Sequence, residues 1–75
     1  MEERIKEILK EALEIEDHDV KLEDEFRNYH EWDSLNRLSL IALIDENFNI
    51  QIENEKFNQL KTVRDLLSHI EEHRG

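Results

Sequence analysis

Ser34 is the residue of this sequence whose surroundings best suit covalent chemistry. It follows Asp33, a residue type that caps helices, and it opens an apolar segment with helical spacing. Free backbone N–H groups and the positive end of a helix dipole would stabilise a phosphodiester on a hydroxyl at such a position. A serine at a helix start is more often a simple cap, so both interpretations stay open at this point.

A catalytic serine would also need a general base and an acid that orients it. His30 lies close to Ser34 in the sequence, but the spacing gives no reason for the two side chains to meet. A chain of 75 residues offers little room for a substrate pocket. We therefore expect no catalytic residue and no enzymatic activity.

Two patterns resemble metal sites, and the sequence favours neither. His69 and His73 lie four residues apart, but no third ligand follows from the spacing, and an exposed polar helix explains the pair. The acidic run at residues 17–21 resembles the start of a calcium loop, yet Leu22 stands where such a loop requires glycine, and Asn28 where it requires glutamate. We therefore expect no metal site.

The spacing of the apolar residues predicts helices that would position Ser34. A first amphipathic helix is predicted over residues 2–15, and a second from the Asp33 cap to about Phe48. Thr62 and Asp65 predict the start of a last helix, and Asn54 one short helical turn before it. The apolar positions expected to be buried in the first and last helices are Ile5, Ile8, Leu9, Ala12, Leu13, Val63, Leu66, Leu67 and Ile70.

The segment over residues 16–32 has no clear period, and a structureless connection of this length is uncommon in a compact domain. Apolar residues are spaced along it and predict an ordered crossover that is anchored to the helices. These anchors are Val20, Leu22, Phe26, Tyr29 and Trp32, and Ile50 and Ile52 anchor a later connection in the same way. The expected fold is an all-α, small four-helix bundle with three main helices, one short helix and a long first loop, forming a single domain over residues 1–75.

The second predicted helix has apolar residues on two faces. Leu40, Ile41, Ile44 and Phe48 fall on one side and are expected in the core. A second stripe lies opposite them and has an acidic border. The stripe consists of Leu35, Leu38 and Ala42, and Asp45 and Glu46 lie beside it. Either this stripe contacts a partner, or the long first loop covers it.

The charge and composition restrict the partners and the chemistry. Twenty acidic residues against ten lysines and arginines give a formal charge of −10, which disfavours nucleic acid and anionic lipid and favours basic protein surfaces. Because there are no cysteines, any thiol must come from a group that is added afterwards. The charged start and the lack of a membrane-length apolar stretch lead us to expect a cytoplasmic protein.

The run Asp33-Ser34-Leu35 opens an apolar helix that ends in Asp45-Glu46-Asn47-Phe48, and this arrangement resembles the Asp-Ser-Leu site and recognition helix of acyl carrier proteins. The resemblance extends over nearly the whole chain, from the first helix at residues 2–8 to the short third helix and the fourth. A lone Asp-Ser-Leu tripeptide is a weak signal. In register with four helices, in an acidic chain of this length, it is a strong one.

The resemblance implies that a phosphopantetheinyl transferase attaches 4'-phosphopantetheine from coenzyme A to Ser34. Acyl groups would then be carried as thioesters on the thiol of this arm, and the protein itself would be a non-catalytic carrier. Asp33 would help to position the transferase. By the same resemblance, Leu35, Leu38 and Ala42 match apolar partner-binding positions, and Asp45 and Glu46 match acidic positions that meet basic docking surfaces on biosynthetic enzymes.

Some residues depart from the pattern of many fatty-acid carriers. His30-Glu31-Trp32 replaces a leucine-glycine pair ahead of the site, and Trp32 is expected either to pack or to line the path of the arm. Asn36, Arg37 and Ser39 make the top of the helix less negative than in typical members. The partners are therefore either fatty-acid enzymes or those of a specialised lipid, polyketide or aminoacyl pathway. The rival interpretation is a helical adaptor that is never modified, and in either case we expect a monomer.

Overall fold

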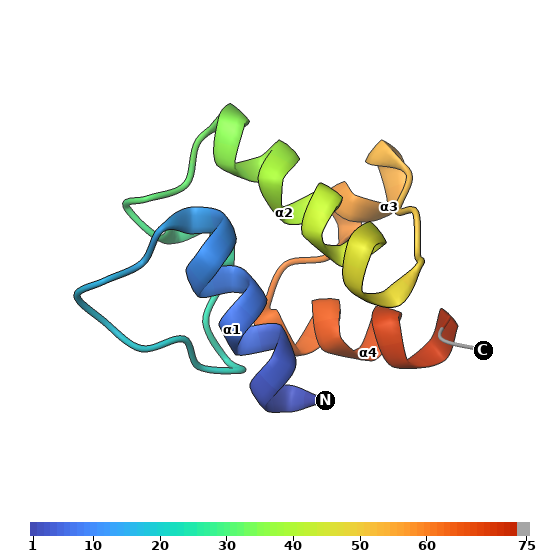
Figure 1. Cartoon of the computed structure of the whole chain (residues 1–75), viewed down its shortest axis with the longest axis horizontal. Coiled ribbons are helices and arrows are strands. Elements are labelled where there is room, and N and C mark those ends of the chain that lie inside the picture. The colour runs from blue at the N-terminus through green and yellow to red at the C-terminus, as the bar shows by residue number, and fades with distance from the viewer. Residues whose placement is uncertain (74–75) are drawn as a thin grey trace.

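The structure, a computed structural model, describes residues 1–73 and consists of four α-helices joined by ordered connections (Figure 1). The helices are α1 (Glu2–Leu13), α2 (Ser34–Phe48), α3 (Asn54–Gln59) and α4 (Val63–His73), and a 3₁₀ turn, Phe26–Asn28, lies within the first loop. α1 packs against α2 and also contacts α4. The predicted all-α bundle is confirmed. None of the helices in residues 1–73 combines the length and apolar character that a membrane span requires.

The helix ends follow from local capping. α1 ends two residues before the predicted boundary because Glu14 adopts a left-handed conformation (φ 56°), and the N–H of Ile15 then bonds to the Lys10 carbonyl at 2.9 Å. α4 begins with a reciprocal cap: the Asp65 N–H donates to Thr62 Oγ1 at 3.1 Å, and the Thr62 N–H donates to Asp65 Oδ2 at 3.2 Å. Bonds from the backbone N–H groups of Thr62 and Lys61 lower the pKa of Asp65, which keeps this cap ionised.

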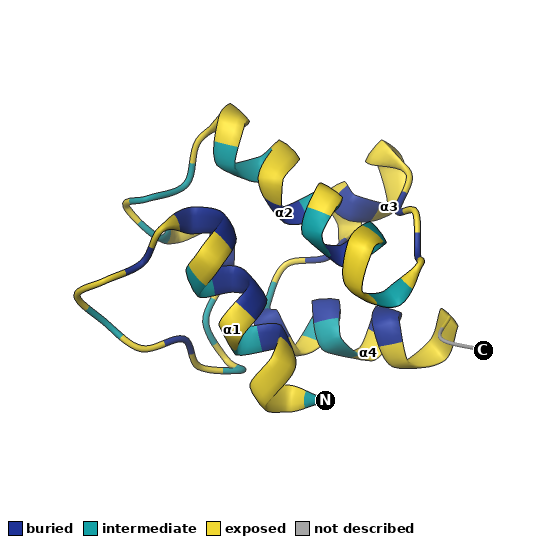
Figure 2. Cartoon of the chain, viewed as in Figure 1, coloured by how far each residue is buried: buried dark blue, intermediate teal, exposed yellow. Residues whose placement is uncertain are grey.

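One apolar core joins all four helices and the first loop (Figure 2). The fully buried large side chains are Phe26, Phe57, Ile5, Leu9, Leu13, Leu40, Ile44, Leu66, Ile70 and Val63. Ile50 and Ile52 are also buried, as predicted for anchors of a connection. Ile41, Phe48 and Leu67 were expected in the core and are only partly buried, because they lie at the edge of their helix faces.

The first loop is ordered by the core and by the start of α4. Val20 and Phe26 are buried, and Leu22, Tyr29 and Trp32 pack against the core while partly exposed, so the predicted anchors are confirmed. The first N–H groups of α4 donate to loop carbonyls: the Val63 N–H bonds to Asp24 and the Arg64 N–H to Leu22, both at 2.9 Å. These bonds satisfy donors that a helix start leaves free, and they fix the loop in place.

Arg27 anchors the end of the loop to α3. Its guanidinium donates to two carbonyls at the C-terminal end of α3, that of Leu60 and, at 2.6 Å, that of Phe57, which also accepts the Leu60 N–H at 3.1 Å. The same group lies 5.0 Å from the centre of the Phe26 ring and 4.9 Å from that of Phe57. Burial lowers the pKa of Arg27. One side chain therefore ties the loop, α3 and two core aromatics together.

His69 departs from the expectation of an exposed polar C-terminal helix. It is 7% exposed, and its Nδ1 atom has no hydrogen-bond partner. The His73 ring lies 4.2 Å away, and its Nδ1 bonds to the His69 carbonyl at 2.9 Å. Burial and the neighbouring His73 lower the pKa of His69, because both disfavour the imidazolium form. The expectation was wrong because the buried face of α4 extends beyond its aliphatic residues and includes His69.

The Arg27→Met variant should be less stable than the wild type by about 2 kcal/mol, because two carbonyls at the end of α3 lose a charged donor. Urea unfolding followed by circular dichroism measures this difference. Arg64→Met is the matched control: its guanidinium makes a surface ion pair with Glu23 and should matter by less than about 0.5 kcal/mol. Equal losses in the two variants would contradict the anchoring role of Arg27.

His69 should make the fold sensitive to mild acid. Its pKa in the folded state lies below that of the unfolded chain, about 6.5, so the unfolded state takes up the proton more readily. As the pH falls below about 6.5, the wild type should lose stability relative to His69→Leu, and it should regain it as the pH rises again. Melting temperatures of both proteins across this range measure the effect. Parallel curves would show that His69 does not contribute.

Candidate functional site

Ser34 is the first residue of α2, and its side chain is exposed. Asp33 caps the helix as predicted: its backbone is extended (φ −154°), and its Oδ1 accepts the Asn36 N–H at 2.7 Å. The hydroxyl of Ser34 thus stands at the positive end of a helix of 15 residues, close to backbone N–H groups that have no carbonyl partner within the helix. These surroundings suit a negatively charged phosphodiester on that hydroxyl.

The segment ahead of Ser34 is held by packing. The Trp32 ring lies nearly parallel to that of Phe57, with centroids 6.2 Å apart and planes 10° apart, and it meets Phe26 edge-on at 5.4 Å. Asn36 donates its side-chain N–H to the Glu31 carbonyl at 2.8 Å. Trp32 is therefore a packing residue. Through it, the aromatic core fixes the backbone two residues before the serine.

The second apolar stripe of α2 is open. Leu35 is 73% exposed and Leu38 is 59% exposed, and Ala42 is exposed on the same helix. The first loop packs elsewhere and does not cover these side chains, so the covered alternative is wrong. Neighbouring exposed leucines on one helix face are typical of a contact surface.

The charged residues of α2 are arranged unevenly. Glu46 is exposed and Asp45 is half-buried in the C-terminal part of the helix, where no basic residue follows. Arg37 turns toward α3, where it donates to Asn54 Oδ1 at 2.9 Å and lies 5.2 Å from the centre of the Phe57 ring. The positive charge of Arg37, near the start of α2, is therefore held by contacts with α3.

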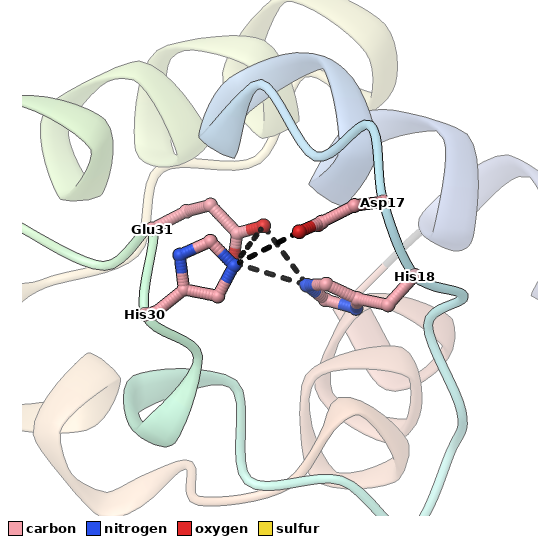
Figure 3. A group of neighbouring side chains, drawn as sticks. All are labelled: Asp17, His18, His30 and Glu31. Atoms are coloured by element: carbon pink, nitrogen blue, oxygen red, sulfur yellow. Dashed lines mark hydrogen bonds and ion pairs between the residues drawn. The ribbon is translucent and has the colours of Figure 1, made fainter.

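The side chain of His30 belongs to a cluster of polar side chains at the ends of the first loop. Its Nε2 atom lies 3.2 Å from Glu31 Oε2 and 3.6 Å from Asp17 Oδ2, and His18 joins them (Figure 3). The Asp19 carbonyl and then Glu31, both bonded to the ring, raise the pKa of His18. This cluster was not predicted from the sequence. The sequence signal for it is weak: a histidine lies next to an acid at each end of the loop. The residues between the two pairs have no periodicity, so spacing does not predict that the pairs meet.

Comparisons with known proteins agree with this geometry. The family described as phosphopantetheine attachment site matches residues 3–70. The acyl carrier protein of Phytoplasma mali (strain AT) is 31% identical over 71 residues, which cover 95% of this chain and 84% of that protein. The acyl carrier protein of Helicobacter hepaticus (strain ATCC 51449 / 3B1) is 33% identical over 69 residues, covering 92% of this chain and 91% of that protein.

A solved structure has the same fold. The solution NMR structure of holo acyl carrier protein from Geobacter metallireducens matches with a TM-score of 0.80 at 20% identity, over 95% of this chain and 82% of that one. The chain therefore belongs to the acyl carrier protein family, whose members contain a phosphopantetheine attachment site. The predicted family, carrier role and 4'-phosphopantetheine prosthetic group are confirmed at this level.

Proposed function

We propose that this chain carries acyl intermediates on a 4'-phosphopantetheine arm attached to the hydroxyl of Ser34. The observation that supports this most directly is the position of that hydroxyl, exposed at the first residue of α2 and preceded by the Asp33 cap. The family match spans this position. Two other serines, Ser39 and Ser68, are also exposed, but both lie inside helices, where no free helix start is available for a phosphate.

The prosthetic group, when bound, supplies the thiol on which acyl groups are held as thioesters. The protein has no cysteine, so no thiol of its own side chains could accept the acyl group in place of the thiol of the arm. The dipole and the free N–H groups at the start of α2 would hold the phosphate end of the arm. Tethering raises the effective concentration of the intermediate for each enzyme that docks, and the carrier needs no catalytic residue.

The exposed face of α2 is the proposed docking surface for the transferase and the acyl-transferring enzymes. Leu35, Leu38 and Ala42 would supply the apolar contact, and their exposure beside Ser34 supports this role. Asp45 and Glu46 would meet lysines and arginines of the enzymes. Charges at the rim of an interface mainly accelerate encounter and select partners.

The enzymes served are proposed to belong to fatty-acid or specialised lipid or polyketide biosynthesis, with the chain acting as a monomer in the cytoplasm. The similarity to acyl carrier proteins over most of their length supports a carrier role. The competing role is an unmodified helical adaptor, which would use the same stripe without any change at Ser34.

Incubation with coenzyme A and a broad-specificity phosphopantetheinyl transferase should add one phosphopantetheinyl group to the wild type. Intact mass spectrometry measures this gain. Ser34→Ala should gain nothing, while Ser39→Ala, which removes another exposed serine of α2, should be modified like the wild type. Wild type that keeps its bare polypeptide mass with several competent transferases would favour the adaptor.

Reversal of two charges, Asp45→Lys with Glu46→Lys, should slow acyl transfer by a cognate enzyme by about tenfold or more at low salt, because steering by opposite charge is lost. Stopped-flow or quenched transfer assays measure the rate. Glu71→Lys with Glu72→Lys on α4 changes the net charge equally and should have a much smaller effect. Equal slowing by both variants would show that overall charge matters and that the face of α2 does not.

A further inference from the structure

Four side chains with metal-binding atoms meet where the two ends of the first loop come together (Figure 3). Asp17 and His18 follow α1, and His30 and Glu31 precede α2. One ligand atom from each residue lies within 4.8 Å of all the others. The cluster joins residues more than ten positions apart in the sequence, so it is formed by the folded loop.

The spacing of the donor atoms fits a small cation. Glu31 Oε2 lies 2.9 Å from His18 Nε2 and 3.2 Å from His30 Nε2, and Asp17 Oδ2 lies 3.6 Å from His30 Nε2. Nitrogen and oxygen ligands bind zinc at about 2.0–2.2 Å, so neighbouring ligands of a tetrahedral site are about 3.3 Å apart. The three observed separations lie on both sides of this value.

A second observation concerns the orientation of His18. Its Nδ1 atom lies 2.9 Å from the Asp19 carbonyl, which can only accept a hydrogen bond, so Nδ1 carries a proton. Its Nε2 atom lies 2.9 Å from Glu31 Oε2, which is also an acceptor, so without a metal this nitrogen carries a proton too, and a bound metal would take the place of that proton. A backbone carbonyl that fixes the tautomer and direction of an imidazole is the usual outer support of a histidine that binds a metal.

Glu31 is also held in place. Its side chain is only 11% exposed, and its backbone carbonyl accepts the bond from Asn36 in the first turn of α2. Histidine binds a metal as the neutral imidazole, so in the metal-bound site the two carboxylates carry a charge that a divalent cation balances. Two of the four donors are imidazole nitrogens, which suit zinc, whereas calcium and magnesium prefer sites made of oxygen atoms.

We propose that Asp17, His18, His30 and Glu31 form a zinc site that links the two ends of the first loop. No metal site was predicted from the sequence, and the two halves of this cluster come together only in the folded loop. Glu31 lies three residues before Ser34 and is bonded to α2. Zinc at this site therefore restrains the segment that leads into the attachment serine. The site requires no modification of Ser34, so it stands or fails separately from the carrier role.

The test is isothermal titration of ZnCl₂ into the full-length chain, purified without a polyhistidine tag, near neutral pH. The wild type should bind one equivalent of zinc, and His30→Gln should weaken the affinity by at least about tenfold. The side chain of His30 is 70% exposed, so this substitution should leave the fold intact, as far-UV circular dichroism will check. Glu31→Gln should weaken zinc binding in the same way.

His73→Gln is the matched control, because His69 and His73 form the other histidine pair within residues 1–73 that could hold zinc. It should bind zinc like the wild type. A second readout is the melting temperature, which saturating zinc should raise in the wild type and in His73→Gln but much less in His30→Gln. Absence of binding by the wild type, unchanged affinity in His30→Gln, loss of binding in His73→Gln, or displacement by equimolar calcium would each overturn the proposal.

Discussion

The packing of the first loop onto Phe57 is the interaction on which the rest of this small protein depends. Trp32 stacks on the Phe57 ring, and Arg27 binds the carbonyls at the end of α3. Without these contacts, a long acidic connection in a chain of net charge −10 would have little reason to stay compact. Because the loop ends at Trp32 and α2 begins two residues later, the same contacts decide where Ser34 stands.

The second helix has two functions that compete for its apolar residues. Leu40 and Ile44 are buried completely and hold α2 against the bundle, whereas Leu35 and Leu38 stay in water. Two leucines left in water forgo the stabilisation that their burial would give to a domain of this size. The exposed pair lies next to the start of the helix, where the prosthetic group of this family is expected to be attached, and this arrangement supports a surface kept open for enzymes.

The first loop connects the two proposed sites. Its end carries Glu31, which belongs to the histidine and carboxylate cluster and which Asn36 bonds to the first turn of α2. A cation held by the cluster would stiffen the approach to Ser34, while the aromatic anchors hold the loop from the other side. The fold that carries both sites is shared with the holo acyl carrier protein of Geobacter metallireducens.

The sequence by itself determined the helices, the caps at Asp33 and Thr62, the second apolar stripe of α2 and the candidate serine, because helical spacing and capping are local properties that depend on residues three or four apart. Ser34, Asp33 and Leu38 lie as their spacing predicts. Tertiary structure alone decided that the loop leaves the stripe uncovered, that His69 is buried, and that His18 meets Glu31. Those outcomes depend on the path of a loop without periodicity, which is set by how distant side chains pack and not by neighbours along the chain.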